Sequence, residues 1–156
     1  MPNIGQLIAS YRLIRWISSD PETSLYLAES TVGEPHQAAV RIANLPNIEE
    51  STNKIKNEGN TLAQVQTRYI PKIIDQSNTH LIRQWSNGTL FSTLLKALRE
   101  HEHTLATPLI STIALKCADA LWGIHQRIPI YGNLHPDHIV FTPTGGMQLL
   151  SLGRQL

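Results

Sequence analysis

The sequence has little of what marks disulfide-stapled, membrane-spanning or nucleic-acid-binding proteins. Its one cysteine, Cys117, cannot form an internal disulfide. No apolar run approaches the roughly 18 residues that a membrane-spanning helix needs, and residues 1–16 lack the basic segment and long apolar stretch of a secretory leader. Charged residues make up only 16% of the chain, the formal net charge is +1, and no run of Lys or Arg is present. We therefore expect a cytoplasmic protein with no nucleic-acid or membrane partner.

What the chain does have is enough apolar material for a folded core. Its 156 residues fit one domain or the larger part of one. Hydrophobic residues make up 41% of the chain and charged residues 16%, a composition too apolar and too weakly charged for a disordered protein. We expect a globular fold, and its strand-rich first half and helical second half place it in the α+β class.

The first half of the chain alternates short strand-like runs with turn-rich pieces. One interruption, residues 49–65, has Ile55, Leu62 and Val65 at helical spacing, so we expect a single helix there. The other runs are rich in β-branched and aromatic residues and predict five strands of an antiparallel sheet. These strands are expected at residues 11–17, 24–30, 37–45, 70–75 and 80–85.

The second half is predicted to be helical up to its last stretch. Leucines at steps of three and four predict a helix over residues 89–101, and a longer apolar stripe predicts another over residues 108–125. Residues 138–152 contain two short apolar runs around the turn "TPTGG", which is typical of a hairpin. The tryptophans Trp16, Trp85 and Trp122 all fall within expected elements, which favours packing roles for them.

This order of elements, with the motifs that it carries, resembles the protein kinase fold, in particular the eukaryotic-like Ser/Thr kinases of bacteria. The motifs in chain order are "SLYLAES", "AAVRI", "NEGNTLAQV", "QWSNGTLFSTLL", "YGNLHPDHIVF" and "LLSLG". The resemblance implies a kinase-like N-lobe over residues 1–86, with a five-stranded antiparallel sheet and one helix. It also implies a partial C-lobe over residues 87–156, with two helices, a degenerate catalytic loop and a hairpin, abbreviated where a kinase would continue.

The resemblance places a phosphate-binding loop between the first two strands, where this sequence has no glycine. Such loops need glycine because backbone N–H groups must approach the phosphates without a Cβ in the way. The three glycine positions fall on Ser18, Asp20 and Thr23. Pro21 removes one N–H, while Asp20 and Glu22 bring negative charge toward the expected phosphates. The loop is therefore poorly suited to ATP.

The remaining nucleotide positions of the resemblance are partly kept. Arg41 replaces the strand lysine that pairs with phosphates, and Glu58 keeps the position of its helix partner. A guanidinium can fork onto a carboxylate but is longer and planar, so we expect an Arg41–Glu58 pair that ties the structure together. Gln84 and Ser86 fall on the hinge, which completes a vestigial nucleotide site.

The positions that would perform phosphoryl transfer are degenerate. Asn133 replaces the catalytic aspartate, and a neutral amide cannot accept the proton of a substrate hydroxyl. His138 and Ser151 replace the two residues that would hold Mg²⁺, and a hydroxyl without a neighbouring carboxylate is a weak Mg²⁺ ligand. We therefore expect no catalytic residue, no metal site and no bound cofactor. The histidine pairs His101/His103 and His135/His138 match no strong zinc-binding pattern.

These features predict a catalytically inactive pseudokinase that acts as a protein-interaction, scaffolding or regulatory module and is not an enzyme. Its abbreviated C-lobe would leave the helical face of residues 109–125 uncovered, which predicts a protein partner or self-association there. One alternative is a nucleotide sensor that binds ATP without Mg²⁺ and without phosphoryl transfer. Others are a residual kinase that uses unorthodox residues, and an unrelated α+β domain.

Overall fold

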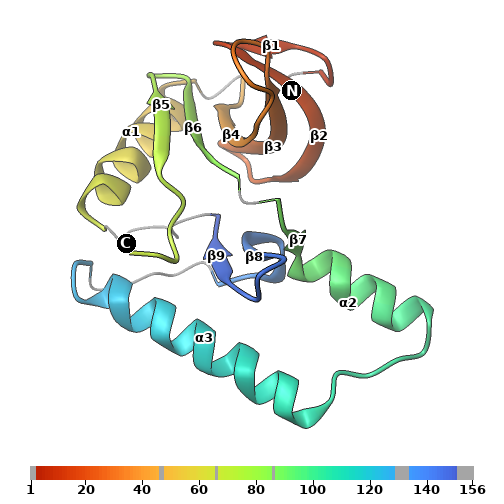
Figure 1. Ribbon diagram of the computed structural model, residues 1–156. Helices are drawn as coiled ribbons and strands as arrows, with labels where there is room; N and C mark the ends of the chain where they lie inside the picture. Colours follow the sequence, from red (N-terminus) through yellow and green to blue (C-terminus); the bar gives the residue numbers. More distant parts are fainter. Residues whose placement is uncertain (1–2, 46–47, 66, 86, 129–133, 151–156) are drawn as a thin grey trace. The chain divides into compact units, whose positions relative to one another are not determined.

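The computed structural model describes residues 3–45, 48–65, 67–85, 87–128 and 134–150 (Figure 1). The chain divides into two compact units, of which the first contains residues 1–63 and 71–87. The second contains residues 64–70 and 88–156. Each unit contains its own sheet, and the short segment 64–70 joins the second unit although the chain then returns to the first.

The first unit is built on a curled antiparallel sheet of six strands in the order β1-β2-β3-β4-β6-β5 (Figure 1). The strands are β1 (Leu7–Ile8), β2 (Tyr11–Ser19), β3 (Thr23–Ser30), β4 (Gln37–Ala43), β5 (Ile73–Gln76) and β6 (His80–Gln84). Five strands were predicted, and all five are present. The sixth, β1, was missed because two residues are too few to show alternation; it pairs with the start of β2.

The two faces of this sheet have different chemistry. Side chains alternate between faces along a strand, so Val40 and Arg41 of β4 point to opposite sides. Val40 belongs to an apolar cluster with its cross-strand partner Ile82. Ala39 and Arg41 point to the other face, and Arg83 joins them there because it lies directly opposite Ala39. One face of the sheet therefore carries two arginines.

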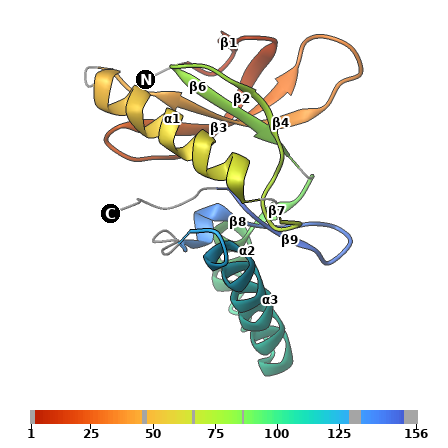
Figure 2. The same cartoon turned by 90° about the vertical axis from the view of Figure 1, so that its left-hand side faces the viewer.

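Helix α1 (Ile48–Gln64) lies against the sheet and confirms the helix predicted over residues 49–65 (Figures 1 and 2). Ile55 and Leu62 are buried on one side of it, as their spacing predicts. Gly59 leaves room for the end of the Gln76 side chain of β5, which a Cβ at this position would displace. The buried positions Ile55 and Glu58 lie on the side of α1 that packs within the first unit.

The second unit combines a three-stranded sheet, in the order β7-β8-β9, with two helices and a short 3-10 helix. Its elements are β7 (Thr89–Leu90), α2 (Phe91–Glu100), α3 (Thr107–His125), η1 (Pro136–His138), β8 (Ile139–Phe141) and β9 (Met147–Leu149). Both predicted helices and the predicted hairpin are present, while β7 was not predicted. Segment 64–70 is tied to this unit because the Leu149 N–H donates to the Tyr69 carbonyl (2.8 Å) and Arg68 pairs with Asp119 (3.0 Å).

Only one of the three tryptophans packs as predicted. Trp85 is buried, whereas Trp16 and Trp122 are half or more exposed. Both exposed rings lie on regular elements, β2 and α3, whose other side faces a core, and a sequence pattern alone does not say which side a large aromatic takes. Within the described ranges, no helix is long and apolar enough to cross a membrane.

Candidate functional site

A buried ion pair joins strand β4 to helix α1. The Nε of Arg41 lies 2.9 Å from Oε2 of Glu58, and both residues are less than 10% exposed, at 3% and 7%. This pair confirms the predicted tie between the two positions. A guanidinium and a carboxylate removed from water lose much hydration free energy, so the pair is stable only where further polar groups surround it.

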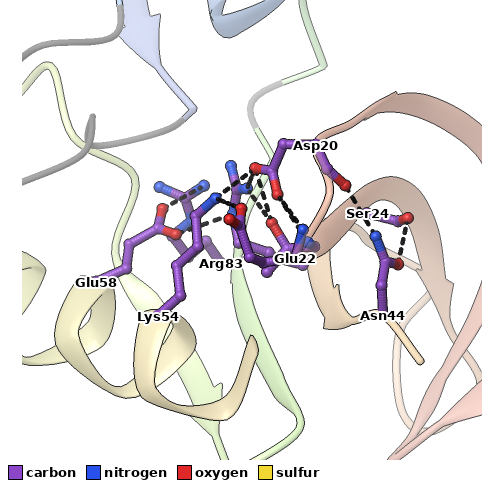
Figure 3. Close-up of polar contacts among 9 residues, drawn as sticks. Asp20, Glu22, Ser24, Asn44, Lys54, Glu58 and Arg83 are labelled. Carbon is purple, nitrogen blue, oxygen red and sulfur yellow. Dashed lines mark hydrogen bonds and ion pairs between the residues drawn. The ribbon is translucent and has the colours of Figure 1, made fainter. Parts of the chain in front are cut away.

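Arg83 brings a second guanidinium to the same carboxylate. Its Nη2 lies 3.7 Å from Oε1 of Glu58, and its side chain is completely buried. Figure 3 shows Lys54 and Glu58 reaching from the helix toward the strand that carries Arg83. Glu58 therefore lies between two arginines of the same sheet face.

The connection between β2 and β3 is a tight turn whose shape is fixed by the side chain of Asp20. Its Oδ1 accepts the backbone N–H groups of Glu22 (3.0 Å) and Thr23 (2.7 Å). A carboxylate that bonds the backbone two and three residues ahead is a common way of closing a turn. Of the three positions aligned with loop glycines, Ser18 and Thr23 lie within strands, and only Asp20 lies in the turn.

The acidic residues of this turn pair with Lys54 of α1 and approach Arg41. The Lys54 ammonium lies 2.7 Å from Oδ2 of Asp20 and 2.9 Å from Oε2 of Glu22. Oδ2 of Asp20 is also 3.6 Å from Nη1 of Arg41, and that nitrogen donates to Thr23 Oγ1 (2.8 Å). Three cationic and three acidic side chains thus form one group, which we call the ion-pair network: Asp20, Glu22, Arg41, Lys54, Glu58 and Arg83.

The network changes the acidity of Asp20. Burial raises the pKa of this carboxyl, but the hydrogen bond from Lys54, the Thr23 N–H and the nearby positive charges outweigh burial and lower the pKa from 3.8 to about 2. Asp20 is therefore ionised in the folded protein throughout the neutral and mildly acidic range.

This low pKa predicts a specific loss of stability in acid. The unfolded carboxyl titrates near 3.8 and the folded one near 2, so its stabilisation is full above about pH 4 and disappears as the pH falls toward 2. Urea unfolding at several pH values measures this loss. At pH 5, Asp20→Asn should be less stable than wild type by on the order of 1 kcal/mol. This value is reduced for solvent screening, because a third of the Asp20 side chain is exposed. The difference should shrink by pH 3. The exposed control Glu29→Gln should not reproduce this trend; a constant difference would contradict it.

Two further predicted site residues, Gln84 and His138, are not among the residues of the network. Gln84 ends β6 and lies opposite Ala38, so it points to the sheet face away from Arg41. His138 ends η1 in the second unit, where its carbonyl accepts the Leu150 N–H (2.7 Å). Ser86, Asn133 and Ser151 lie outside the described residues. Among the residues that are described, no three metal-binding side chains come together.

Two members of the network, Lys54 and Arg83, were not predicted. Lys54 precedes Glu58 by four residues and so shares its helix face, a spacing that could have identified it. Arg83 lies in the run "HLIRQ" and carries no comparable signal, because its burial depends on the register between β4 and β6. The strands themselves were predictable, but the pairing that brings these residues together was not.

The chain has a protein kinase-like fold. The chain is similar to the crystal structure of the Mycobacterium tuberculosis PknI kinase domain, with a TM-score of 0.71 and 17% sequence identity over 100% of this chain and 64% of that one. A cysteine-to-alanine mutant of that domain gives a TM-score of 0.72 and 18% identity over 98% and 63%. This chain therefore spans less than two thirds of those kinase domains. No family model and no curated protein matches the sequence.

Proposed function

We propose that this chain is a catalytically inactive kinase-like domain that acts by binding a partner protein or a second copy of itself. The observation that supports this most directly is the ion-pair network. Arg41 and Glu58 hold the positions that pair around ATP phosphates in a kinase, but here Arg41 lies near Asp20, and Glu58 near Arg83, of the same chain. Charges that would serve a nucleotide are neutralised within the fold.

The sequence supports the same proposal at the positions for catalysis. Asn133 cannot act as the base, and neither His138 nor Ser151 supplies a carboxylate for Mg²⁺. Phosphoryl transfer depends on positioning and on electrostatic stabilisation by metal and cationic groups, so these replacements act on separate parts of the reaction. A fold that retains its framework without these groups is suited to recognition.

The proposed binding surface lies on helix α3. Leu115 and Trp122 are seven residues apart, which places them on one side of the helix, and they are 71% and 70% exposed. Ala118 lies between them and is exposed as well. We call these three residues the α3 surface. Exposed large apolar groups at adjacent positions favour contact with another protein.

Two assays test the absence of nucleotide chemistry. Transfer of radiolabelled phosphate from ATP to the chain itself or to a generic acceptor is expected to stay at background. Thermal unfolding with millimolar ATP, with and without Mg²⁺, is expected to show no shift. A ligand at about 100 times its Kd would stabilise the protein by about 2.7 kcal/mol, or several degrees. Label transfer would overturn the proposal in favour of a kinase, and a shift without Mg²⁺ in favour of a nucleotide sensor.

The α3 surface is tested by its effect on association. Light scattering of the wild-type chain over a range of concentrations is expected to show species larger than the monomer, and Leu115→Ser with Trp122→Ser is expected to return the mass to that of the monomer. The matched control is Val32→Ser with Leu45→Ser, which removes two apolar groups of similar exposure (67% and 75%) from the first unit. Equal loss of association in both double variants would show that general surface hydrophobicity, and not the α3 surface, is responsible.

A further inference from the structure

The acidic turn between β2 and β3 faces the cations of α1 and β4. Asp20 and Glu22 hold the Lys54 ammonium between them at 2.7 and 2.9 Å, and Asp20 also lies 3.6 Å from the Arg41 guanidinium. The oxygen atoms of a phosphate group carry negative charge, as carboxylate oxygens do, and they pair with lysine and arginine at similar distances. The two carboxylates therefore occupy positions next to these cations that the oxygen atoms of an anionic ligand could take.

The turn holds its carboxylates in place through contacts that do not involve the cations. Asn44 donates from Nδ2 to the Asp20 carbonyl (3.0 Å) and from its backbone N–H to the Glu22 carbonyl (2.8 Å). Ser24 donates to Oδ1 of Asn44 (2.7 Å), which fixes the orientation of that amide. Because the turn is ordered by these bonds, its acidic groups lose little further conformational freedom when they pair with Lys54 and Arg41.

We propose that this turn is an intramolecular anion, which occupies the cationic site formed by Arg41 and Lys54 and excludes phosphate-bearing ligands from it. The charge balance supports this role. The network contains three cationic and three acidic side chains. Without the charges of Asp20 and Glu22, the network would contain three cationic side chains and one carboxylate, that of Glu58. The side chain of Lys54 is 27% exposed, so solvent anions reach that end of the site. This inference concerns the turn alone and holds whether or not α3 binds a partner.

The experiment compares anion binding before and after the two charges are removed. The variant is Asp20→Asn with Glu22→Gln, in which the Asn oxygen can still accept the N–H groups that close the turn. Thermal unfolding is followed by tryptophan fluorescence with millimolar inorganic pyrophosphate, without Mg²⁺, against sodium chloride of equal ionic strength. The matched control is Glu29→Gln with Glu34→Gln, which removes the same charge from exposed positions of the first unit.

Wild type and control are expected to show no difference between the two salts, whereas pyrophosphate should raise the Tm of the double variant by several degrees. The proposal is overturned if wild type responds to pyrophosphate as strongly as the variant, or if the control gains the same response. It is also overturned if the variant has a native circular dichroism spectrum and shows no response. Should the double variant not fold, Glu22→Gln alone retains every turn bond of Asp20, and it is expected to show a smaller but measurable rise.

Discussion

Glu58→Gln is expected to lower the free energy of unfolding of the first unit by about 3 kcal/mol. The amide has nearly the same shape as the carboxylate but no charge. It leaves Arg41 and Arg83, which are almost completely buried, without the carboxylate that they share. Removal of one partner from a buried ion pair generally costs about 3–5 kcal/mol. We expect the lower end because Asp20 remains 3.6 Å from Arg41.

Because the chain divides into two units, this measurement needs a probe for the first one alone. The chain has three tryptophans, and Trp122→Phe leaves only Trp16 and Trp85, both in the first unit. Urea unfolding followed by fluorescence in that background then reports the unit that contains the network, without the two-state assumption for the whole chain.

Two controls separate charge from packing. Glu50→Gln, at an exposed position in the first turn of the same helix, should change the free energy of unfolding by less than about 0.5 kcal/mol. Replacement of Arg41, Glu58 and Arg83 together by methionine should recover most of the loss, because a buried ionic group can often be exchanged for apolar residues of similar volume. A loss below about 1 kcal/mol for Glu58→Gln would mean that the two arginines do not depend on this carboxylate.

The longer elements of the first unit could be predicted because each leaves a local signal, either helical spacing or a run of β-branched and aromatic residues between turns. Tyr11 and Leu13 are buried on either side of the exposed Arg12, and Ile55 and Leu62 share one face of a helix. The two-residue strands Leu7–Ile8 and Thr89–Leu90 leave no such signal, since their existence depends on a neighbouring strand. Local pattern thus predicts the longer elements, and it predicts the three-residue strands β8 and β9 through the turn that joins them.

The network could be predicted only in part, and the reason is register. Arg41 and Glu58 were identified through positions that the kinase fold keeps, and Asp20 and Glu22 through their charge. Arg83 was missed because an arginine in a short apolar strand is ordinarily assigned to solvent. The pairing of Ala39 with Arg83 determines that it points inward, and a shift of one residue would have placed it on the other face.

The position of α1 connects the apolar packing of the first unit to this network. Lys54, Ile55 and Glu58 occupy little more than one helical turn, so the residue that anchors the helix adjoins the two that carry charge. Ile55 is completely buried, whereas Lys54 and Glu58 direct their charged ends to the turn and to the arginines. The hydrophobic contact therefore sets the distances over which the ion pairs form.

Ile55→Ala is accordingly expected to destabilise the first unit by about 3 kcal/mol, since truncation of a fully buried isoleucine costs about 2–5 kcal/mol through lost burial and the cavity left behind. Lys56→Ala, at an exposed position of the same helix, is the control and should have little effect. Urea unfolding in the Trp122→Phe background measures both.

The link between packing and charge is tested by combining Ile55→Ala with Lys54→Met. If Ile55 holds the helix where Lys54 meets Asp20 and Glu22, the loss of the lysine charge should cost less once the helix anchor is weakened. The two effects are then non-additive by about 0.5 kcal/mol or more. Additive effects would mean that the acidic turn and Lys54 find each other without the anchor, and that the turn, rather than the apolar core, determines where this end of α1 lies.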